Sequence, residues 1–424
     1  MTTTDVMMMG WLSPKALASV SLGFNLYLPI MLFGIGVVSA AAPIAAARVG
    51  ANAADRDGVR RVAHQAFWLS LALALPIWIG LWHARAILTA IGEPPDLAAL
   101  AGRYMHGLEW ALAPNLLYFS ARSVFSALDR TRPILIAALL ALAFNALANY
   151  ALDFGHFGFP ALGVFGSGLS TTLSQALMFV ALVVYSRLDP RLHEARLFSP
   201  PFVFDFPALA EIWRLGAPIG LTIAVEVGTF AAAALGMGLI GADAVAAHAI
   251  VIQIASNAFM VPLGVGQAAS VRVGHAFGGR DRARISRAGW AAFAITIACV
   301  TLSAATMLAI PRLLIAPFLG SDAANEAGII ALALSFLRIA ALFQIVDGAQ
   351  AALANMLRGV HDSRVPALMA ILGYWAIGAP VSFGLGFLTP LKGLGLWIGL
   401  AAGLASVSAL LLGRWLARQR RGFF

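Results

Sequence analysis

Long runs of apolar residues, separated by short polar segments, make up most of this chain. Runs such as 135–152, 162–185, 216–241 and 288–310 approach or exceed the ~20 residues that a helix needs to cross a bilayer. The pattern predicts an all-α polytopic membrane protein with eleven complete spans and a partial one at about 1–12. The complete spans are expected near 16–44, 65–88, 98–120, 133–152, 161–185, 208–237, 244–270, 286–311, 327–350, 364–387 and 393–416.

The polar segments between these spans repeat along the chain. One pair of loops matches at an offset of 224 positions, with Arg48-Val49-Gly50, Arg56-Asp57 and Arg60 against Arg272-Val273-Gly274, Arg280-Asp281 and Arg284. A second pair matches at an offset of 233, with Ala121, Asp129, Pro133 and Leu135 against Ala354, Asp362, Pro366 and Leu368. Upstream, Gly10 and 16–18 resemble Gly238 and 244–246 at an offset of 228. Matches at nearly one spacing indicate a duplication.

The duplication predicts two six-helix bundles that form a parallel internal repeat, because an even number of helices returns the chain to the same side of the membrane. We expect an N-lobe at 1–186, a cytoplasmic linker at 187–207 and a C-lobe at 208–424. The helix at 208–237 has its counterpart before residue 1, so the first helix is expected to be truncated. Either the chain start is assigned too far downstream, which we favour, or the chain is a shortened homologue.

Composition and charge agree with a membrane protein. Of the 424 residues, 61% are hydrophobic and 11% are charged, and the mean hydropathy of +0.86 excludes an ordinary soluble domain. Twenty of the 28 Lys and Arg residues fall in alternate connections and the C-terminal tail, so the positive-inside rule places these loops and the C-terminus in the cytoplasm. The net charge of +9 is therefore an orientation signal, and we expect no nucleic-acid partner. The start of the chain predicts no cleavable signal peptide, and Cys299 is alone, which excludes disulfides.

Two carboxyl groups in the second half are the strongest candidates for function, because charges inside spans are costly. Glu226 is the only charged residue between Arg214 and Asp243, and Asp347 has Gln344 and Gln350 about one turn away on either side. Structural alternatives are a carboxyl group kept neutral by a hydrogen bond or an ion pair of Asp347 with Arg338. Nine residues place Arg338 about 180° round the helix from Asp347, which disfavours that pair.

The first half carries a different polar set. Asn145 and Asn149 share a helix face, and Thr171 lies on the next helix, so their amides and hydroxyl could ligate a cation or orient a carboxylate. They could equally hold transmembrane helices together. Asp5 lies in the partial span, where it could instead be a frayed tail residue. Further polar residues within spans, for which a structural role is the simpler interpretation, are His248, Asn25, Asn257 and Arg122.

Buried carboxyl groups suit antiport for a physical reason. Desolvation favours the neutral form of a carboxylic acid, whereas a nearby cation favours the charged form, so such a group can exchange H⁺ or Na⁺. Neutralisation changes the free energy of each conformation, and that difference couples an ion to a transported compound.

Several segments along the chain together match one known family. The most specific stretch is Val261-Pro262-Leu263-Gly264 with 267–274, and further segments are 5–10, 17–23, 33–36, Asn145 with Asn149-Tyr150, and Leu357-Arg358-Gly359. On these segments the chain resembles, over nearly its whole length, a multidrug and toxic compound extrusion (MATE) transporter of the bacterial NorM-like branch.

The resemblance implies export of cationic, amphipathic compounds in antiport with Na⁺ or H⁺ across the inner membrane, by alternating access of the two lobes. It implies cation-coupling roles for Glu226, Asp347 and Asp5, with a Na⁺ site at Glu226 and Asp347. Asn145, Asn149, Thr171 and Gln344 would line the substrate or ion sites. We expect a monomer in the lipid bilayer that needs no cofactor beyond the coupling ion and is not an enzyme.

Other functions remain open at this level. A flippase of lipid-linked or polysaccharide substrates predicts Arg or Lys in the cavity, for which Arg122 and Arg338 are among the few candidates. A transporter impaired by the lost helix is a further alternative. A membrane-embedded enzyme is disfavoured, because we find no paired His-Glu metal motif, Ser-His-Asp set or phosphate-binding glycine loop.

Overall fold

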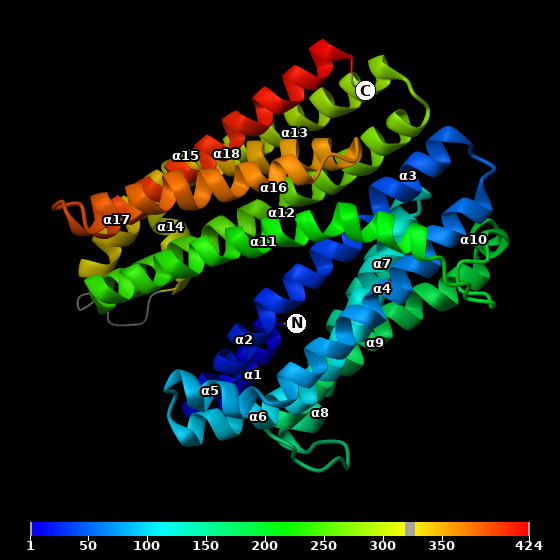
Figure 1. Ribbon diagram of the computed structural model, residues 1–424. Helices are drawn as coiled ribbons and strands as arrows, with labels where there is room; N and C mark the ends of the chain where they lie inside the picture. The colour runs from blue at the N-terminus through cyan, green and yellow to red at the C-terminus, as the bar shows by residue number, and fades with distance from the viewer. Residues whose placement is uncertain (1, 319–326, 423–424) are drawn as a thin grey trace. The chain divides into compact units, whose positions relative to one another are not determined.

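The computed structural model describes residues 2–318 and 327–422, and almost all of them lie in helices (Figure 1). Within these ranges no strand occurs, and ten helical segments are long and apolar enough to cross a bilayer. The predicted all-α polytopic fold is confirmed. The chain divides into two compact units, unit 1 (Met1–Gly220) and unit 2 (Leu221–Phe424). This division falls within helix α11 (Phe206–Ile240), whereas the lobe boundary predicted from the sequence lies at residue 208.

Unit 1 consists of helices that begin at conventional capping residues. Ser13 accepts a hydrogen bond from the backbone N–H of Ala16 at 3.0 Å, and Pro14 follows as the first helical residue. The helices of the unit, besides the first part of α11, are α1 (Thr2–Leu12), α2 (Pro14–Ser39), α3 (Ala41–Ala51), α4 (Arg56–Trp82), α5 (Ala84–Ile91), α6 (Pro95–Leu108), the 3-10 helix η1 (Glu109–Ala111), α7 (Leu112–Ala127), α8 (Arg132–Phe154), α9 (Val164–Leu188) and α10 (Pro190–Ala195).

The span predicted near 98–120 is not one continuous α-helix. Here η1 separates α6 from α7, which contain 14 and 16 residues, and each is shorter than the ~20 residues of a complete span. This break accounts for ten long apolar helices in the described ranges where eleven were predicted. It also places Glu109 at a point where the regular hydrogen-bond ladder changes.

The repeated loops use the same capping chemistry in the two units. Asp55 accepts a hydrogen bond from the N–H of Gly58 at the start of α4, and Asp281 accepts one from Arg284 at the start of α13, each at 2.9 Å. The equivalent caps are therefore Asp55 and Asp281, not Asp57 and Asp281 as the sequence match aligned them. The segment from the matched arginine to the capping aspartate is two residues longer in unit 2, from Arg272 to Asp281, than in unit 1, from Arg48 to Asp55.

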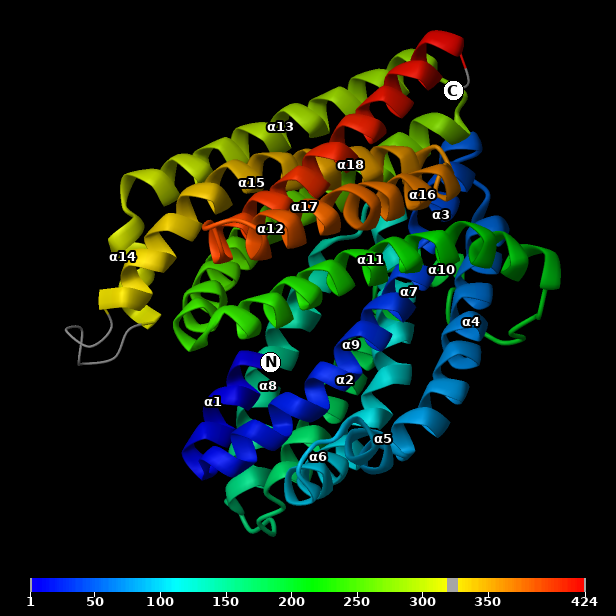
Figure 2. The same ribbon diagram turned by 60° about the vertical axis from the view of Figure 1, so that its left-hand side comes forward.

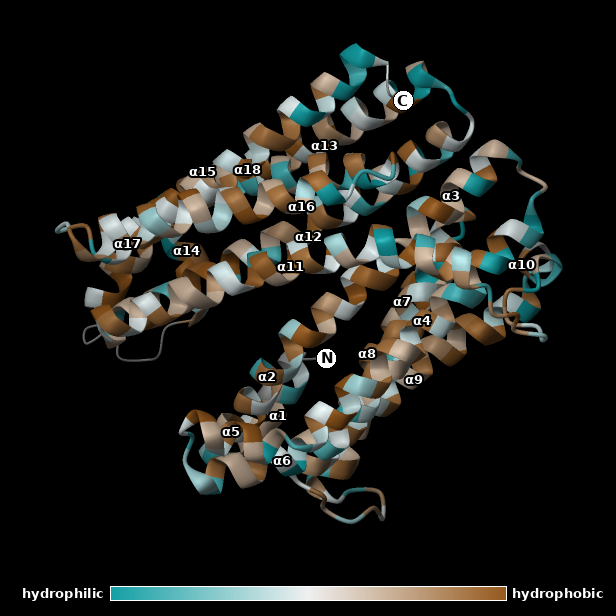
Figure 3. Ribbon diagram, in the orientation of Figure 1, coloured by the Kyte–Doolittle hydropathy of each residue, from teal (hydrophilic) through white to brown (hydrophobic). Residues whose placement is uncertain are grey.

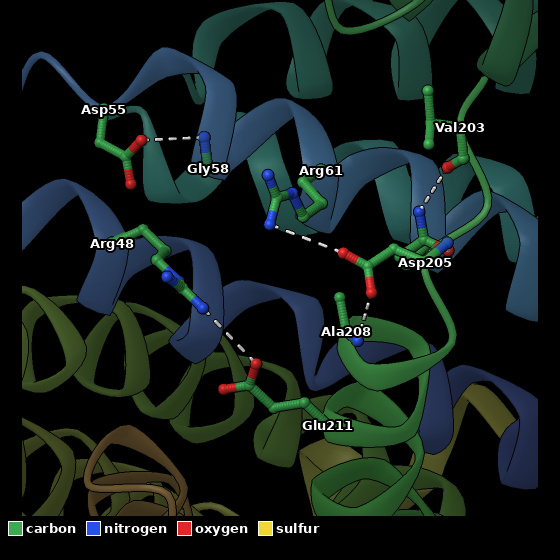
Figure 4. A network of polar contacts seen from close by, with 9 residues as sticks. Arg48, Asp55, Gly58, Arg61, Val203, Asp205, Ala208 and Glu211 are labelled. Atoms are coloured by element: carbon green, nitrogen blue, oxygen red, sulfur yellow. Dashed lines mark hydrogen bonds and ion pairs between the residues drawn. The ribbon is translucent and has the colours of Figure 1, made fainter. Parts of the chain in front are cut away.

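The linker between the repeats is fixed to unit 1 by polar contacts on α4 (Figure 4). The side chain of Gln65 donates to the carbonyl of Val203 at 2.7 Å and accepts from the N–H of Asp205 at 3.0 Å. Asp205 caps α11 through the N–H of Ala208 at 3.2 Å and pairs with Arg61 at 3.6 Å. The sequence predicted a cytoplasmic linker at 187–207. It did not show that the C-terminal end of this linker would be hydrogen-bonded to α4.

Unit 2 contains the rest of α11 and a bundle in which α15 and α18 lie side by side (Figures 1 and 2). Gly373 and Gly378, in a π-helical segment, approach α18 so closely that an added Cβ would meet Val407 at 2.4 Å and Gly403 at 2.9 Å. The other helices of the unit are α12 (Ala242–Gly278), α13 (Arg282–Ala309), α14 (Pro311–Ile315), η2 (Ala316–Phe318), α15 (Ala327–Gly359), α16 (Arg364–Ile371), the π-helix η3 (Leu372–Gly378), α17 (Ala379–Phe387) and α18 (Gly393–Arg421).

The outer faces of the helices are apolar. Hydrophobic residues predominate along the helices, and hydrophilic residues concentrate towards helix ends and loops (Figure 3). Leu235, Leu239 and Leu302 are 75%, 79% and 70% exposed, which is the pattern of side chains that face lipid rather than water. The chain is therefore a multi-pass membrane protein.

Candidate ion and substrate sites

A hydrogen-bonded acidic cluster forms in unit 1 where α1, α8 and α9 meet. Asp5 is 4% exposed, so it is not a frayed tail residue. One carboxylate oxygen accepts from the amide of Asn149 at 2.5 Å, and the other accepts from the hydroxyl of Thr171 at 2.8 Å. Ser170 donates to the Asn149 amide oxygen, which orients the amide group towards Asp5. The structure thus brings together Asp5, Asn149 and Thr171 from three helices.

Asn145 completes this side of the cluster. It lies one turn before Asn149 on α8, is fully buried and is close enough to Asp5 to interact with it. Neither of its amide atoms has a hydrogen-bond partner that meets ordinary geometric limits among the described residues. It is therefore available to a ligand or a water molecule at this point.

The sequence analysis missed a second carboxyl group in this cluster. Asp153 lies one turn after Asn149, is 1% exposed, and has no hydrogen-bond partner on either oxygen in the described part of the chain. Its charge interacts with that of Asp5. Two carboxylates so close together in a dry environment favour uptake of a proton or another cation. The signal was the i, i+4, i+8 spacing of Asn145, Asn149 and Asp153, but Asp153 lies just beyond the predicted span.

Close packing of α8 on α9 holds this carboxyl group. A Cβ at Gly166 would lie 2.8 Å from the carbonyl oxygen of Leu152 and 2.9 Å from Oδ1 of Asp153. Only glycine leaves room for the two helices to approach at this point. The position of Asp153 therefore depends on a residue on the neighbouring helix.

A second cluster forms in unit 2 around Asp347 on α15. Asp347 is 5% exposed, and its Oδ1 has no hydrogen-bond partner within the described ranges. Gln344 is fully buried, and both of its amide atoms are likewise unpartnered there. Glu226 on α11 is partly buried and close enough to Asp347 for the two charges to interact. Arg338 is exposed and lies outside this group of side chains.

Two further residues join the unit 2 cluster although the sequence did not point to them. Tyr374 is 2% exposed, lies in the π-helix η3, and interacts electrostatically with Glu226 and Asp347. Its hydroxyl group has no partner in the part of the chain that is described. Arg358, which the sequence analysis included in a segment matching the family but not among the site residues, is partly buried and interacts with Glu226. π-Helical segments often occur at functional sites, but sequence alone does not show them.

Both clusters contain side chains with oxygen atoms that can bind a cation. Carboxylate, amide and hydroxyl oxygens suit hard cations such as Na⁺, and carboxylates also take protons. The positive charges of organic cations can be balanced by the same carboxylates. The clusters lie in different units.

Comparisons with known proteins agree with this arrangement. The model of the family MatE matches residues 1–151 and 218–383, which include most of the two clusters. A protein of Mesorhizobium japonicum, named a probable multidrug resistance protein NorM, is 49% identical over 422 residues, covering 99% of this chain and 90% of the relative. A protein of the same name from Brucella suis is 44% identical over 415 residues, covering 98% of this chain and 88% of the relative.

Solved structures share the fold. The eukaryotic MATE transporter AtDTX14 superposes with a TM-score of 0.84 at 22% identity, covering 99% of this chain and 92% of that one. An outward-facing multidrug resistance transporter of the MATE family gives a TM-score of 0.86 at 20% identity with the same coverage. With the family model matching most of the chain, and relatives well above 30% identity along nearly all of it, the chain belongs to the MATE family of transporters.

Proposed function

We propose that the protein exports cationic, amphipathic compounds from the cytoplasm in antiport with Na⁺ or H⁺. The observation that carries this proposal is the group of unpartnered oxygen atoms on Asp347, Gln344 and Tyr374, next to Glu226. Buried polar atoms without partners are costly, and a bound cation would satisfy them. The names of the relatives support multidrug compounds as substrates.

In this proposal, coupling arises because the coupling ion and the organic cation compete for the same carboxylates. When Na⁺ or H⁺ neutralises Glu226 and Asp347, an organic cation loses its counter-charge and is released. When the ion leaves, the carboxylates are again available to a substrate cation. Arg358 supplies an internal positive charge near Glu226, which makes ion release from that carboxylate less costly.

The cluster at Asp5 and Asp153 provides a second ion site in unit 1. In this proposal the lobes at 1–186 and 208–424, joined by the linker at 187–207, alternate between inward and outward access. The Arg-rich loops and the C-terminus face the cytoplasm. The protein acts as a monomer in the inner membrane, and it needs no cofactor and catalyses no covalent reaction.

Efflux of ethidium from cells tests the proposal. Glu226→Gln and Asp347→Asn are expected to reduce efflux about 5- to 150-fold, the range of a coupling free energy of about 1–3 kcal/mol. Glu211→Gln is the matched control for Glu226, because Glu211 lies on the same helix but is exposed and pairs only loosely with Arg48 at 3.7 Å. Wild-type efflux by both site variants, at equal membrane levels, would refute the proposal.

Proteoliposomes distinguish the two coupling ions. A Na⁺ gradient and a pH gradient are imposed separately while uptake of ethidium is followed. The gradient that drives uptake identifies the ion, and Asp347→Asn should abolish the response to that gradient.

A further inference from the structure

A third buried carboxyl group lies in unit 1, apart from the cluster around Asp5. The side chain of Glu109 is 2% exposed, and neither carboxylate oxygen has a hydrogen-bond partner in the described residues. Nδ1 of His106, one turn earlier, lies 3.6 Å from Oε1 of Glu109. The imidazole ring of His106 packs on Trp82, with ring centroids 4.7 Å apart.

This pair faces away from the Asp5 cluster. Tyr104 on α6 is the residue that interacts with Asp5 and Asp153, and Glu109 follows it by five residues, about 140° round the helix axis. On that other side, Trp78 of α4 donates its indole N–H to the carbonyl oxygen of Glu109 at 2.6 Å. The hydrogen bond fixes the backbone of η1, and with it the carboxyl group, against α4.

The pair lies at the end of α4 remote from its Arg-rich start. His106 contacts Trp82, the last residue of α4, and Trp110 packs on Trp78 at 5.1 Å. Trp82 and Trp110 are 55% and 50% exposed, as expected for tryptophans at the boundary between lipid and water. His106 therefore lies close to the aqueous boundary, while Glu109 is enclosed behind it.

Among the described residues, the charged group that interacts with Glu109 is His106. Of the other charged groups at this end of the unit, Arg103 on α6 and Arg85 on α5 are exposed, and Lys15 at the start of α2 pairs with Asp96 at 3.0 Å. His83 is also exposed, and its ring contacts the backbone oxygen of Ile79.

This geometry admits one kind of ligand. Within the described ranges no three His, Cys, Asp or Glu side chains gather as a metal site, so a divalent ion would find only the two donors here. A proton needs a single lone pair, and here either the imidazole or the carboxylate 3.6 Å from it can take one. We propose that His106 and Glu109 form a proton-binding pair at the outer end of unit 1, separate from the ion sites of the two clusters.

The proton moves from the outer water to the imidazole of His106, and no covalent bond other than N–H or O–H changes. Protonation gives an imidazolium that the carboxylate of Glu109 attracts, one turn later on the same helical segment. The assignment to the outer side rests on the orientation given in the proposed function. Proton binding by the pair does not rest on it.

Tryptophan fluorescence measures the protonation directly, because an imidazolium quenches an indole that it touches. Purified protein in detergent is titrated from about pH 8 to pH 5, the range in which histidine changes charge. Emission from the wild type is expected to fall as the pH decreases. Trp82→Phe and His106→Gln should each remove most of this pH-dependent change, whereas the matched control His83→Gln should retain it.

Glu109→Gln keeps the shape of the side chain and removes its charge. The quench is expected to change in this variant, because the imidazolium has lost its counter-charge. A pH-dependent quench that survives His106→Gln, or that is unchanged in Glu109→Gln, would overturn the proposal. Thermal unfolding in the same detergent confirms that each variant is folded, and Glu109→Gln provides the test if His106→Gln is not.

Failure of this inference can be told apart from failure of the proposed function. Asp347→Asn should lose ethidium efflux yet keep the full fluorescence titration. His106→Gln should keep ethidium efflux and lose the pH-dependent fluorescence change. A wild type without the quench would refute the pair while leaving the antiport proposal intact.

Discussion

The buried aspartates Asp5 in unit 1 and Asp347 in unit 2 differ in how their carboxylate oxygens are satisfied. In unit 1, both oxygens of Asp5 accept hydrogen bonds, from Asn149 at 2.5 Å and from Thr171 at 2.8 Å. In unit 2, Oδ1 of Asp347 and both amide atoms of Gln344 have no partner among the described residues. The protein's own side chains satisfy both oxygens of Asp5, whereas the unpartnered atoms of Asp347 and Gln344 remain open to a ligand.

This difference suggests that one buried carboxyl group stabilises the fold and the other binds a cation. Hydrogen bonds to a carboxylate stabilise its charge without any ion, so Asp5 is a preorganised part of the fold as well as a candidate ligand. Binding of a cation should stabilise the unpartnered side chains at Asp347 more than those at Asp5. Each polar atom that gains a partner no longer contributes the free-energy cost of being buried without one. Substitution of Asp5 should therefore lower stability more than substitution of Asp347 does.

The largest stability effect is expected for Gly166→Ala in unit 1. The added Cβ would lie 2.8 Å from the oxygen of Leu152, and the backbone must shift to relieve the contact. We expect a loss of about 3 kcal/mol in the free energy of unfolding, measured by SDS titration in mixed micelles. Gly264→Ala in α12 is the control, because a Cβ there meets nothing within 4 Å. Equal stabilities of the two variants would show that α8 and α9 pack less tightly than described.

The next effect compares the two aspartates directly. Asp5→Asn places an amide N–H₂ group against the donors of Asn149 and Thr171, and one donor is left without an acceptor. Unfolding should become easier by about 2 kcal/mol. Asp347→Asn breaks no hydrogen bond at Oδ1 and should change the midpoint of the same titration little. The comparison between the clusters fails if Asp347→Asn is the more destabilising of the two.

The sequence predicted the fold because its signals are local. Twenty-residue apolar runs define membrane helices, and a lone charge such as Glu226 or Asp347 inside one is conspicuous. Asn145 and Asn149 were singled out by their i, i+4 spacing and Thr171 as a polar residue on the next helix, and in the structure all three interact with Asp5. Sequence matching was less successful in the repeated loops. The match paired Asp57 with Asp281, but the residues that cap α4 and α13 are Asp55 and Asp281, because identical residues in two loops need not make the same hydrogen bonds.

The residues that were missed depend on breaks in regular helices. Asp153 falls at the end of α8, where an acidic residue resembles a loop position. Glu109 lies in η1 and Tyr374 in η3, and neither the 3-10 nor the π segment has a signature that apolar periodicity shows. Arg358 was counted with the cytoplasmic charges, because a helix end in sequence says nothing about where a long side chain reaches.

A smaller effect on transport is expected from Tyr374→Phe. The hydroxyl of Tyr374 has no partner in the described residues, so its removal should leave stability unchanged while one ligand oxygen is lost near Asp347. Ethidium efflux should fall about 5-fold, at the lower end of coupling free energies. Tyr150→Phe, on the exposed face of α8, is the control. A destabilised Tyr374→Phe variant with normal efflux would assign the hydroxyl to packing instead of to the site.

The smallest effect concerns charges that water can reach. Arg61 pairs with Asp205 at 3.6 Å in unit 1, but the Arg61 side chain is 63% exposed. Because solvent screens such a pair, Arg61→Gln should cost only about 0.5 kcal/mol in the SDS titration. Gln65→Ala, by contrast, removes two hydrogen bonds to the linker and should cost more. If Arg61→Gln lowers the free energy of unfolding as much as Asp5→Asn does, solvent exposure does not determine how much a charged side chain of unit 1 contributes to stability. The expected difference between the buried cluster and the surface ion pairs of this unit would then be refuted.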